Sequence, residues 1–294
     1  MKLIKPSVEI LEPSLTEGYM LSEEQIRLQD IFSDIERAGR TCYKSEDKIT
    51  EDSAEKFVQM LIDRGHTAML EHGTVYLKYS TKWEGNNFTD KYYSNKYSII
   101  KKEDTGKSTK DGWAISDFYI TTNYRVLYEN GWLDDLQYLC EPTDFHEKRV
   151  SVRFICDRGV SHELVRHRVF SFAQESTRYC NYSKDKFGNE LTFIEPCWID
   201  EDILEGKENV LAETEFFAEL EIAEAQYFKL LKLGWQSQQA RAVLPNALKT
   251  EIIMTGFVSD WEHFFELRTA QSAHPQMREL AIPLRQMFID RNYI

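Results

Sequence analysis

Apolar residues recur with a helical period in three long stretches of the chain. The first begins at Ser22 and Gln25, which have the spacing of a capping box, and Gly39 is the expected end of that helix. Residues 53–65 carry a second amphipathic pattern, and residues 208–235 place apolar side chains near a 3.6-residue period. These patterns predict two helices near the N-terminus and one long helix in the second half.

Further helix signals follow in the second half of the chain. Ser161 is expected to cap a short helix that follows it, and Ser259 with Glu262 predicts the start of another. Pro275 suits the first turn of a last helix. We expect Pro283 to bend that helix, because proline removes a backbone donor.

Alternating apolar and polar residues predict strands over residues 75–79 and 147–157. Because helices dominate and the strands lie in the middle, the sequence predicts an α+β fold in a single domain over residues 1–294. Residues 81–112 are rich in Lys, Asp, Ser, Asn and Gly, and they predict an exposed insertion or lid.

Composition and charge then restrict the partners. The chain has 294 residues, of which 42% are hydrophobic, and its formal net charge is −13. So acidic a surface repels nucleic acid and anionic lipid, so we expect neither as a partner, and any anion site must be local. Five cysteines without metal-ligand spacing indicate reduced thiols, and the polar N-terminus is no signal peptide, so we expect a soluble cytoplasmic protein.

The segment ELVRHRVFSFAQESTRY, residues 163–179, concentrates cations beside a serine. Arg166, His167 and Arg168 precede Ser176, and Arg178 follows it. A planar guanidinium binds phosphate or carboxylate through two parallel hydrogen bonds, so this pattern favours an anion site. A surface ion-pair cluster with nearby acidic residues is the alternative.

Gln174, Ser176 and Arg178 alternate, so an extended strand would present all three on one side. An amide, a hydroxyl and a guanidinium side by side suit the base, sugar and phosphate of a nucleotide. A polar strand edge is the alternative interpretation. Ser176 fits a covalent nucleophile less well, because no base is positioned beside it in the sequence.

Other motifs are weaker or absent. His66 and His72 flank Glu71 at a spacing that matches no firm zinc motif, so we expect no metal site. The chain has no GxGxxG or Walker loop, so a dinucleotide would have to bind outside a Rossmann fold. Arg241 and Arg268, taken singly, have the character of structural residues.

These blocks together resemble one known family. RHR, seven residues and then Ser176 is the signature of flavin-dependent thymidylate synthases, and SHELVRHRVFSFAQESTRY is similar to that family throughout. So are the GH and EH pairs within residues 65–72, RAVLPNALKTE from Arg241 and HFFELR ending at Arg268. The blocks occur in the family's order.

The resemblance implies a homotetramer of α+β subunits with active sites built where subunits meet. It also implies FAD reduced by NADPH, 5,10-methylenetetrahydrofolate as the one-carbon donor, and the conversion of deoxyuridylate (dUMP) to thymidylate (dTMP). Two other functions stay open at this point: a nucleotide-binding flavin oxidoreductase without methyl transfer, and a nucleotide sensor without catalysis.

The resemblance also assigns roles by motif. Arg268 would lie at the uracil ring as the catalytic residue, and Arg241 would reach the dUMP phosphate from another subunit. The full set implied to bind dUMP is Glu163, Arg166, Gln174, Glu175, Ser176, Thr177, Arg178, Arg241 and Arg268. The set implied to bind FAD is His66, Arg166, His167, Arg168, Gln174 and His263.

The chain departs from the family pattern at three places. Glu163 stands where members often carry glutamine, and a carboxylate near a phosphate needs a proton or a compensating arginine. Ala68 stands where members often have serine or threonine, and residues 257–259 replace an Asn-x-Arg pair that some members carry.

Overall fold

The computed structural model describes residues 1–15, 22–81, 87–110, 112–184, 187–199 and 207–294. The helices are α1 (Glu23–Tyr43), α2 (Ser53–Asp63), α3 (Asn87–Tyr93), α4 (Tyr124–Asn130), α5 (Arg158–Leu164), α6 (Lys207–Lys232), α7 (Ser237–Ala240), α8 (Val258–Arg268) and α9 (Pro275–Asp290). The strands are β1 (Lys2–Ile4), β2 (Ser7–Leu11), β3 (Thr74–Thr81), β4 (Ile99–Ser108), β5 (Ala114–Asn123), β6 (Arg149–Asp157), β7 (Ser171–Gln174), β8 (Thr192–Ile194) and β9 (Lys249–Phe257).

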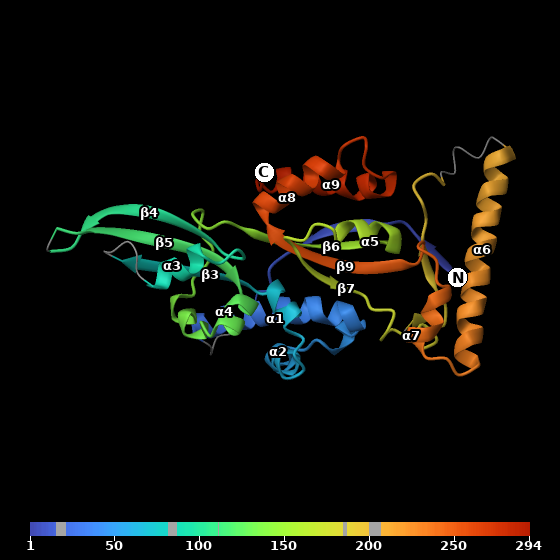
Figure 1. The fold of residues 1–294 in the computed structure, drawn as a ribbon, viewed down its shortest axis with the longest axis horizontal. Helices are drawn as coiled ribbons and strands as arrows, with labels where there is room; N and C mark the ends of the chain where they lie inside the picture. The colour runs from blue at the N-terminus through green and yellow to red at the C-terminus, as the bar shows by residue number, and fades with distance from the viewer. Residues whose placement is uncertain (16–21, 82–86, 111, 185–186, 200–206) are drawn as a thin grey trace.

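The central sheet joins four strands in the order β2-β6-β9-β7, and each neighbouring pair is antiparallel. Figure 1 shows α8 and α9 along one face of this sheet and α1 along the other. Layers of helix on an antiparallel sheet confirm the predicted α+β class. Along the described residues, no helix combines the length and apolar character needed to cross a bilayer.

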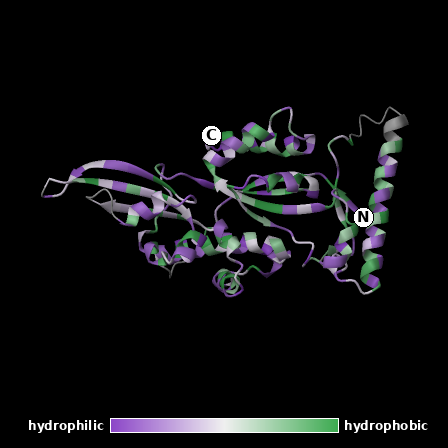
Figure 2. Cartoon of the chain, in the orientation of Figure 1, coloured by the Kyte–Doolittle hydropathy of each residue, from purple (hydrophilic) through white to green (hydrophobic). Residues whose placement is uncertain are grey.

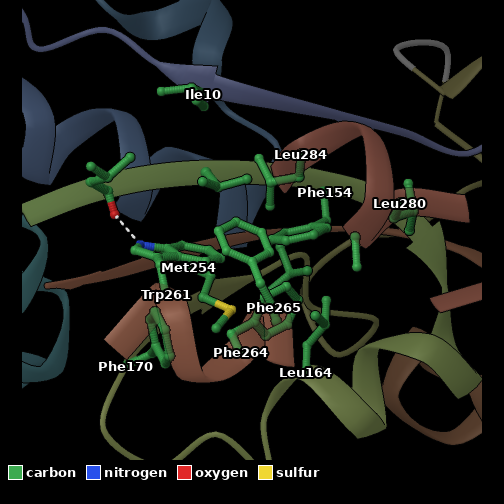
Figure 3. Close-up of a cluster of buried hydrophobic side chains, with 14 of the residues drawn as sticks. Ile10, Phe154, Leu164, Phe170, Met254, Trp261, Phe264, Phe265, Leu280 and Leu284 are labelled. Carbon is green, nitrogen blue, oxygen red and sulfur yellow. Dashed lines mark hydrogen bonds between the residues drawn. The ribbon is translucent and has the colours of Figure 1, made fainter. Parts of the chain in front are cut away.

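Aromatic side chains of α8 form the centre of the main core. Trp261 and Phe264 are fully buried, and they pack with Phe154 of β6 and Leu164 of α5, as Figure 3 shows. The Trp261 indole Nε1–H donates to the Val150 carbonyl at 3.2 Å, so this large residue is buried without an unpaired donor. One core therefore holds α8 and α5 against the same sheet.

The opposite face of the central sheet packs on α1. Ala38 of α1, Ala173 of β7 and Ile253 of β9 form a small buried cluster there. β9 is thus covered on both faces, and Figure 2 shows its hydrophobic residues in the middle of the molecule. β7 is an edge strand, and both of its faces are packed. This packing fixes the motif residues at its two ends.

A second antiparallel sheet, in the order β3-β5-β4, extends away from the central sheet in Figure 1. The segment expected to be an exposed insertion supplies α3 and β4, while residues 82–86 and 111 lie outside the described residues. Most of β4 is exposed, but Tyr92 of α3 is fully buried and its hydroxyl donates to Asp135 at 2.6 Å. This polar segment therefore contains folded elements, and the buried Tyr92 anchors it.

Several local predictions can be compared directly with the structure. The capping box of Ser22 and Gln25 is confirmed, but Gly39 does not end α1, which continues to Tyr43 and closes at Lys44 in the left-handed conformation. Gly39 is instead a contact point, because an added Cβ would lie 2.6 Å from the Phe57 ring. The helix could continue because packing on α2 outweighs the weak helix preference of glycine.

One prediction for the C-terminal helices is also wrong. Ser259 does not cap α8, which begins at Val258 after Phe257 and has no side-chain cap. Pro275 occupies the first turn of α9 as predicted, and the helix continues past Pro283 to Asp290. None of the five cysteines is part of a disulfide.

Gly256 of β9 allows Phe170 to pack over the strand. A Cβ at this position would overlap the Phe170 ring. We expect Gly256→Ala to lower the free energy of unfolding by about 1–3 kcal/mol, because the ring must move out of a close-packed core. Urea denaturation measures this change. Adding Phe170→Leu should recover part of the loss, whereas an additive double variant would contradict the assignment.

Candidate functional site

Strand β7 carries the candidate site, because motif residues stand immediately before and after its four residues. Helix α5 ends at Leu164, residues 165–170 form a turn, and residues 175–180 follow the strand. A four-residue strand spans about 13 Å. The two groups of motif residues therefore lie at opposite ends of β7.

Asp157, at the end of β6, begins α5. Its carboxylate accepts the Val160 amide at 2.7 Å and the Gln276 side-chain amide at 2.8 Å. The prediction of Ser161 as the cap is wrong, because the strand turns into the helix four residues earlier. Ser161 lies inside the helix, where its hydroxyl accepts the Gln174 amide at 2.9 Å. This contact joins α5 to the far end of β7.

At the first end of β7, three predicted site residues meet around one guanidinium. Arg268 Nη1 donates to the Glu163 carboxylate at 2.7 Å, and Nη2 donates to the Glu163 carbonyl at 3.2 Å. Arg268 Nε donates to His167 Nε2 at 2.9 Å. Every nitrogen of this side chain therefore has an acceptor.

Burial of His167 and the neighbouring positive charges of Arg268 and His263 lower the pKa of the imidazole to about 4. The ring also packs against Phe264 and Phe170. His167 is consequently neutral near pH 7, and its Nε2 is free of a proton and can accept from Arg268. His263 itself is exposed on α8 and contacts Glu266 at 3.4 Å.

At the second end of β7, residues after the strand form a tight turn. The Ser176 amide donates to the Cys42 carbonyl at 3.1 Å, and its hydroxyl accepts the Arg178 amide at 3.3 Å. Arg241, in the 3₁₀ turn Arg241–Val243, donates to the Thr177 hydroxyl at 3.3 Å. Gln174, Ser176 and Arg178 do not share one strand face, because β7 ends at Gln174 and the chain then turns.

Glu175 stabilises this turn from the protein interior. Its carboxylate is 2% exposed, and it accepts from Lys249 at 2.9 Å and from the Tyr182 hydroxyl at 2.9 Å. Lys249 also pairs with Glu251, and the network borders a cavity of about 500 Å³. The structure thus places Glu175 inside an ion-pair network under the turn.

Two tyrosines that sequence reasoning missed join His66 to this second end. The rings of Tyr43 and Tyr179 lie 5.1 Å apart, and the Tyr43 hydroxyl is 3.3 Å from His66 Nδ1. The Arg178 guanidinium lies 5.2 Å from the centre of the Tyr179 ring. A tyrosine directly after a motif arginine was the signal available in the sequence.

Four motif arginines are exposed and have no carboxylate partner within the described parts of the chain. They are Arg166, Arg168, Arg178 and Arg241. This differs from the surface ion-pair cluster that was the alternative interpretation, because the acidic residues nearby pair with other cations. In the same described residues, no three His, Cys, Asp or Glu side chains form a group that could hold a metal ion.

Comparison with known proteins decides the family. Residues 140–291 match the family model described as thymidylate synthase complementing protein. The chain belongs to this family. The matched range includes both ends of β7 and the helices α5 to α9, whereas the sheet β3-β5-β4 lies before it.

Relatives of the family carry the name flavin-dependent thymidylate synthase. The protein from Pyrococcus furiosus is 33% identical over 141 residues, which are 47% of this chain and 53% of its own length. That from Mycobacterium avium is 35% identical over 143 residues, 45% of this chain and 54% of its own. The chain thus spans about half the length of these relatives. A longer match, 27% identical over 266 residues, covers 87% of this chain and 74% of the protein from Mycolicibacterium vanbaalenii.

The low pKa of His167 makes stability depend on pH. The unfolded histidine titrates near 6.5 and the folded one near 4, so the unfolded chain takes up more protons as the pH falls between these values, and stability falls with it. Burial lowers the pKa of His72 to about 3, and His72 acts in the same direction.

We expect His167→Gln to weaken this pH dependence, because glutamine keeps an acceptor for Arg268 but takes up no proton. Urea denaturation at about pH 7 and about pH 5 measures the slope. His72 remains in both proteins and serves as the internal control. An equal slope in the variant would show that His167 is not neutral in the folded state.

Proposed function

We propose that the chain is a flavin-dependent thymidylate synthase that converts dUMP to dTMP. In this reaction 5,10-methylenetetrahydrofolate donates the one-carbon unit and NADPH reduces FAD. The observation that carries the proposal is the set of exposed motif arginines that have no carboxylate partner among the described residues, in a chain of net charge −13. The chain has 49 acidic residues and only 36 basic ones. Motif cations that have no carboxylate partner among the described residues therefore favour anionic ligands.

The turn after β7 suits a nucleotide phosphate. Arg178 and Arg241 supply guanidinium groups, and the Thr177 hydroxyl already contacts Arg241. Ser176 supplies a hydroxyl, and no titratable side chain of the described residues is bonded to it. We therefore assign Ser176 a hydrogen-bonding role toward dUMP rather than a nucleophilic one. Glu175 positions the turn through Lys249.

The turn before β7 suits the pyrophosphate of FAD. Arg166 and Arg168 are exposed cations, and neutral His167 stands between them, so the donor set fits an anionic dinucleotide. We assign His66, His263 and Gln174 to the same cofactor from the family motif. When bound, FAD would carry the hydride that the methylation requires.

The separation of the two groups favours a site shared between subunits. Glu163, Arg166 and Arg268 lie at the first end of β7, whereas Ser176 and Arg178 lie at the second end. A nucleotide that contacts both groups is best accommodated where the two ends of β7 from different subunits face each other. This geometry supports the proposed homotetramer. Five cysteines outside any disulfide fit a reducing compartment, and we place the protein in the cytoplasm.

Arg268 is our candidate for the catalytic residue. For uracil C5 to attack a one-carbon unit, negative charge must develop along the N3–C2–O2 edge of the ring. A guanidinium held there stabilises the developing charge more than the neutral ground state, and this lowers the barrier. Phe264 and Phe265 anchor α8 in the core, so the end of the helix that carries Arg268 is rigidly placed.

We expect the purified protein to be yellow and to bleach with NADPH in the absence of oxygen. This readout tests the proposed flavin chemistry, and complementation of a thymidine-requiring strain tests methyl transfer. A colourless protein that added FAD cannot reconstitute would favour a nucleotide sensor. Bleaching without complementation would favour an oxidoreductase that transfers no methyl group.

Replacing Arg178 should weaken nucleotide binding selectively. We expect Arg178→Ala to reduce dUMP affinity by about 1.5–3 kcal/mol, because a charge-assisted hydrogen bond to phosphate is lost. Titration calorimetry with dUMP measures this loss, and flavin absorbance measures retained FAD. Arg285→Ala removes an exposed arginine of α9 as the matched control. Equal loss of both ligands in Arg178→Ala would contradict the division between the two turns.

A further inference from the structure

All three nitrogens of Arg268 already donate within the folded chain, and two of its five N–H groups remain for a ligand. Its three nitrogens donate to the Glu163 carboxylate, the Glu163 carbonyl and His167 Nε2, at 2.7, 3.2 and 2.9 Å. Both terminal nitrogens, which would form the fork toward a ring edge, already donate to Glu163, so a carboxylate lies beside the two N–H groups that remain. A ring edge that binds through both terminal nitrogens therefore competes with Glu163 for Arg268.

The three contacts differ in how easily they can open. The Glu163 carbonyl belongs to the last turn of α5, which Leu164 fixes in the core. The His167 ring is buried and packs against Phe264. The Glu163 carboxylate is the movable partner, because its side chain is 27% exposed and can rotate toward solvent while both helices stay in place.

We propose that Glu163 is an internal counter-ion that occupies Arg268 until dUMP displaces it, and so sets the affinity and selectivity for the nucleotide. This inference rests on the proposed function. Glu163 is a positioning residue here, because it acts through Arg268. The ligand edge must compete with a charged acceptor, so a pyrimidine that offers a weaker acceptor edge is held less well.

Charge on Glu163 is the property that matters. An ionised carboxylate holds a guanidinium more strongly than a neutral amide of the same size does. Glutamine at this position would keep one acceptor oxygen and the same side-chain length, but it would release Arg268 more easily. The pair is only partly buried, with Arg268 17% exposed, so its contribution is modest and screened.

The test is a double-mutant cycle on the assembled, flavin-loaded protein, with dUMP affinity measured by titration calorimetry. We expect Glu163→Gln to bind dUMP about three- to tenfold more tightly, the difference between a charged and a neutral acceptor on Arg268. In the Arg268→Gln background the same change should have no effect, because the group it acts through is gone.

A control separates this effect from a general loss of negative charge. Glu262→Gln removes one charge from an exposed position on α8 and should change dUMP affinity by less than about twofold. A merely structural Glu163, which only ties α5 to α8, predicts a lower melting temperature and no gain in affinity. Glu163→Met repeats the test if Glu163→Gln does not fold.

The outcomes are distinct. Weaker or unchanged dUMP binding by folded Glu163→Gln overturns the counter-ion and leaves the proposed function standing. A gain that persists in the Arg268→Gln background also overturns it, since the charge would then act directly on the phosphate. If the unaltered flavin-loaded protein does not bind dUMP, both the proposed function and this inference fail.

Discussion

The packing of the α8 aromatics on β6 and β9 is the interaction on which the site depends. Trp261 and Phe264 are fully buried, and the same cluster holds Leu164 at the end of α5. Two charged residues, Glu163 and Arg268, thereby stand at the ends of two helices anchored in one core. Close packing permits little relative movement of these helices, so the spacing of the polar groups above them is well defined.

Charge is distributed in two ways around β7. Under the turn that follows the strand, Glu175 and Lys249 neutralise each other in a buried network, which gives the turn a rigid base. On the surface, Arg178 and Arg241 have no carboxylate partners among the described residues. Buried charges need partners to offset desolvation, whereas exposed ones can remain available for a ligand.

The sheet β3-β5-β4 adds a second structural unit to this arrangement. It lies before the segment that matches the family model, and around Leu77, Ile120 and Tyr92 it packs in a second buried cluster that it shares with α1 and α2. Its outer strand β4 is polar, so composition indicated exposure correctly for that strand. The buried Tyr92 was hidden, because the polar segment contains several aromatic residues and its composition does not show which of them is buried.

The sequence by itself determined the fold class, the long helices and the residue types of the site. Capping-box spacing and apolar periodicity are local properties, and they placed α1, α2 and α6 correctly. Only the tertiary structure decided that α1 continues past Gly39. The Phe57 ring occupies the space that a side chain at this position would fill. It also decided that β7 separates the two motif groups and that Glu163 occupies Arg268, 105 residues away in the chain. Contacts at such separations depend on how helices and strands pack, and a local pattern cannot contain them.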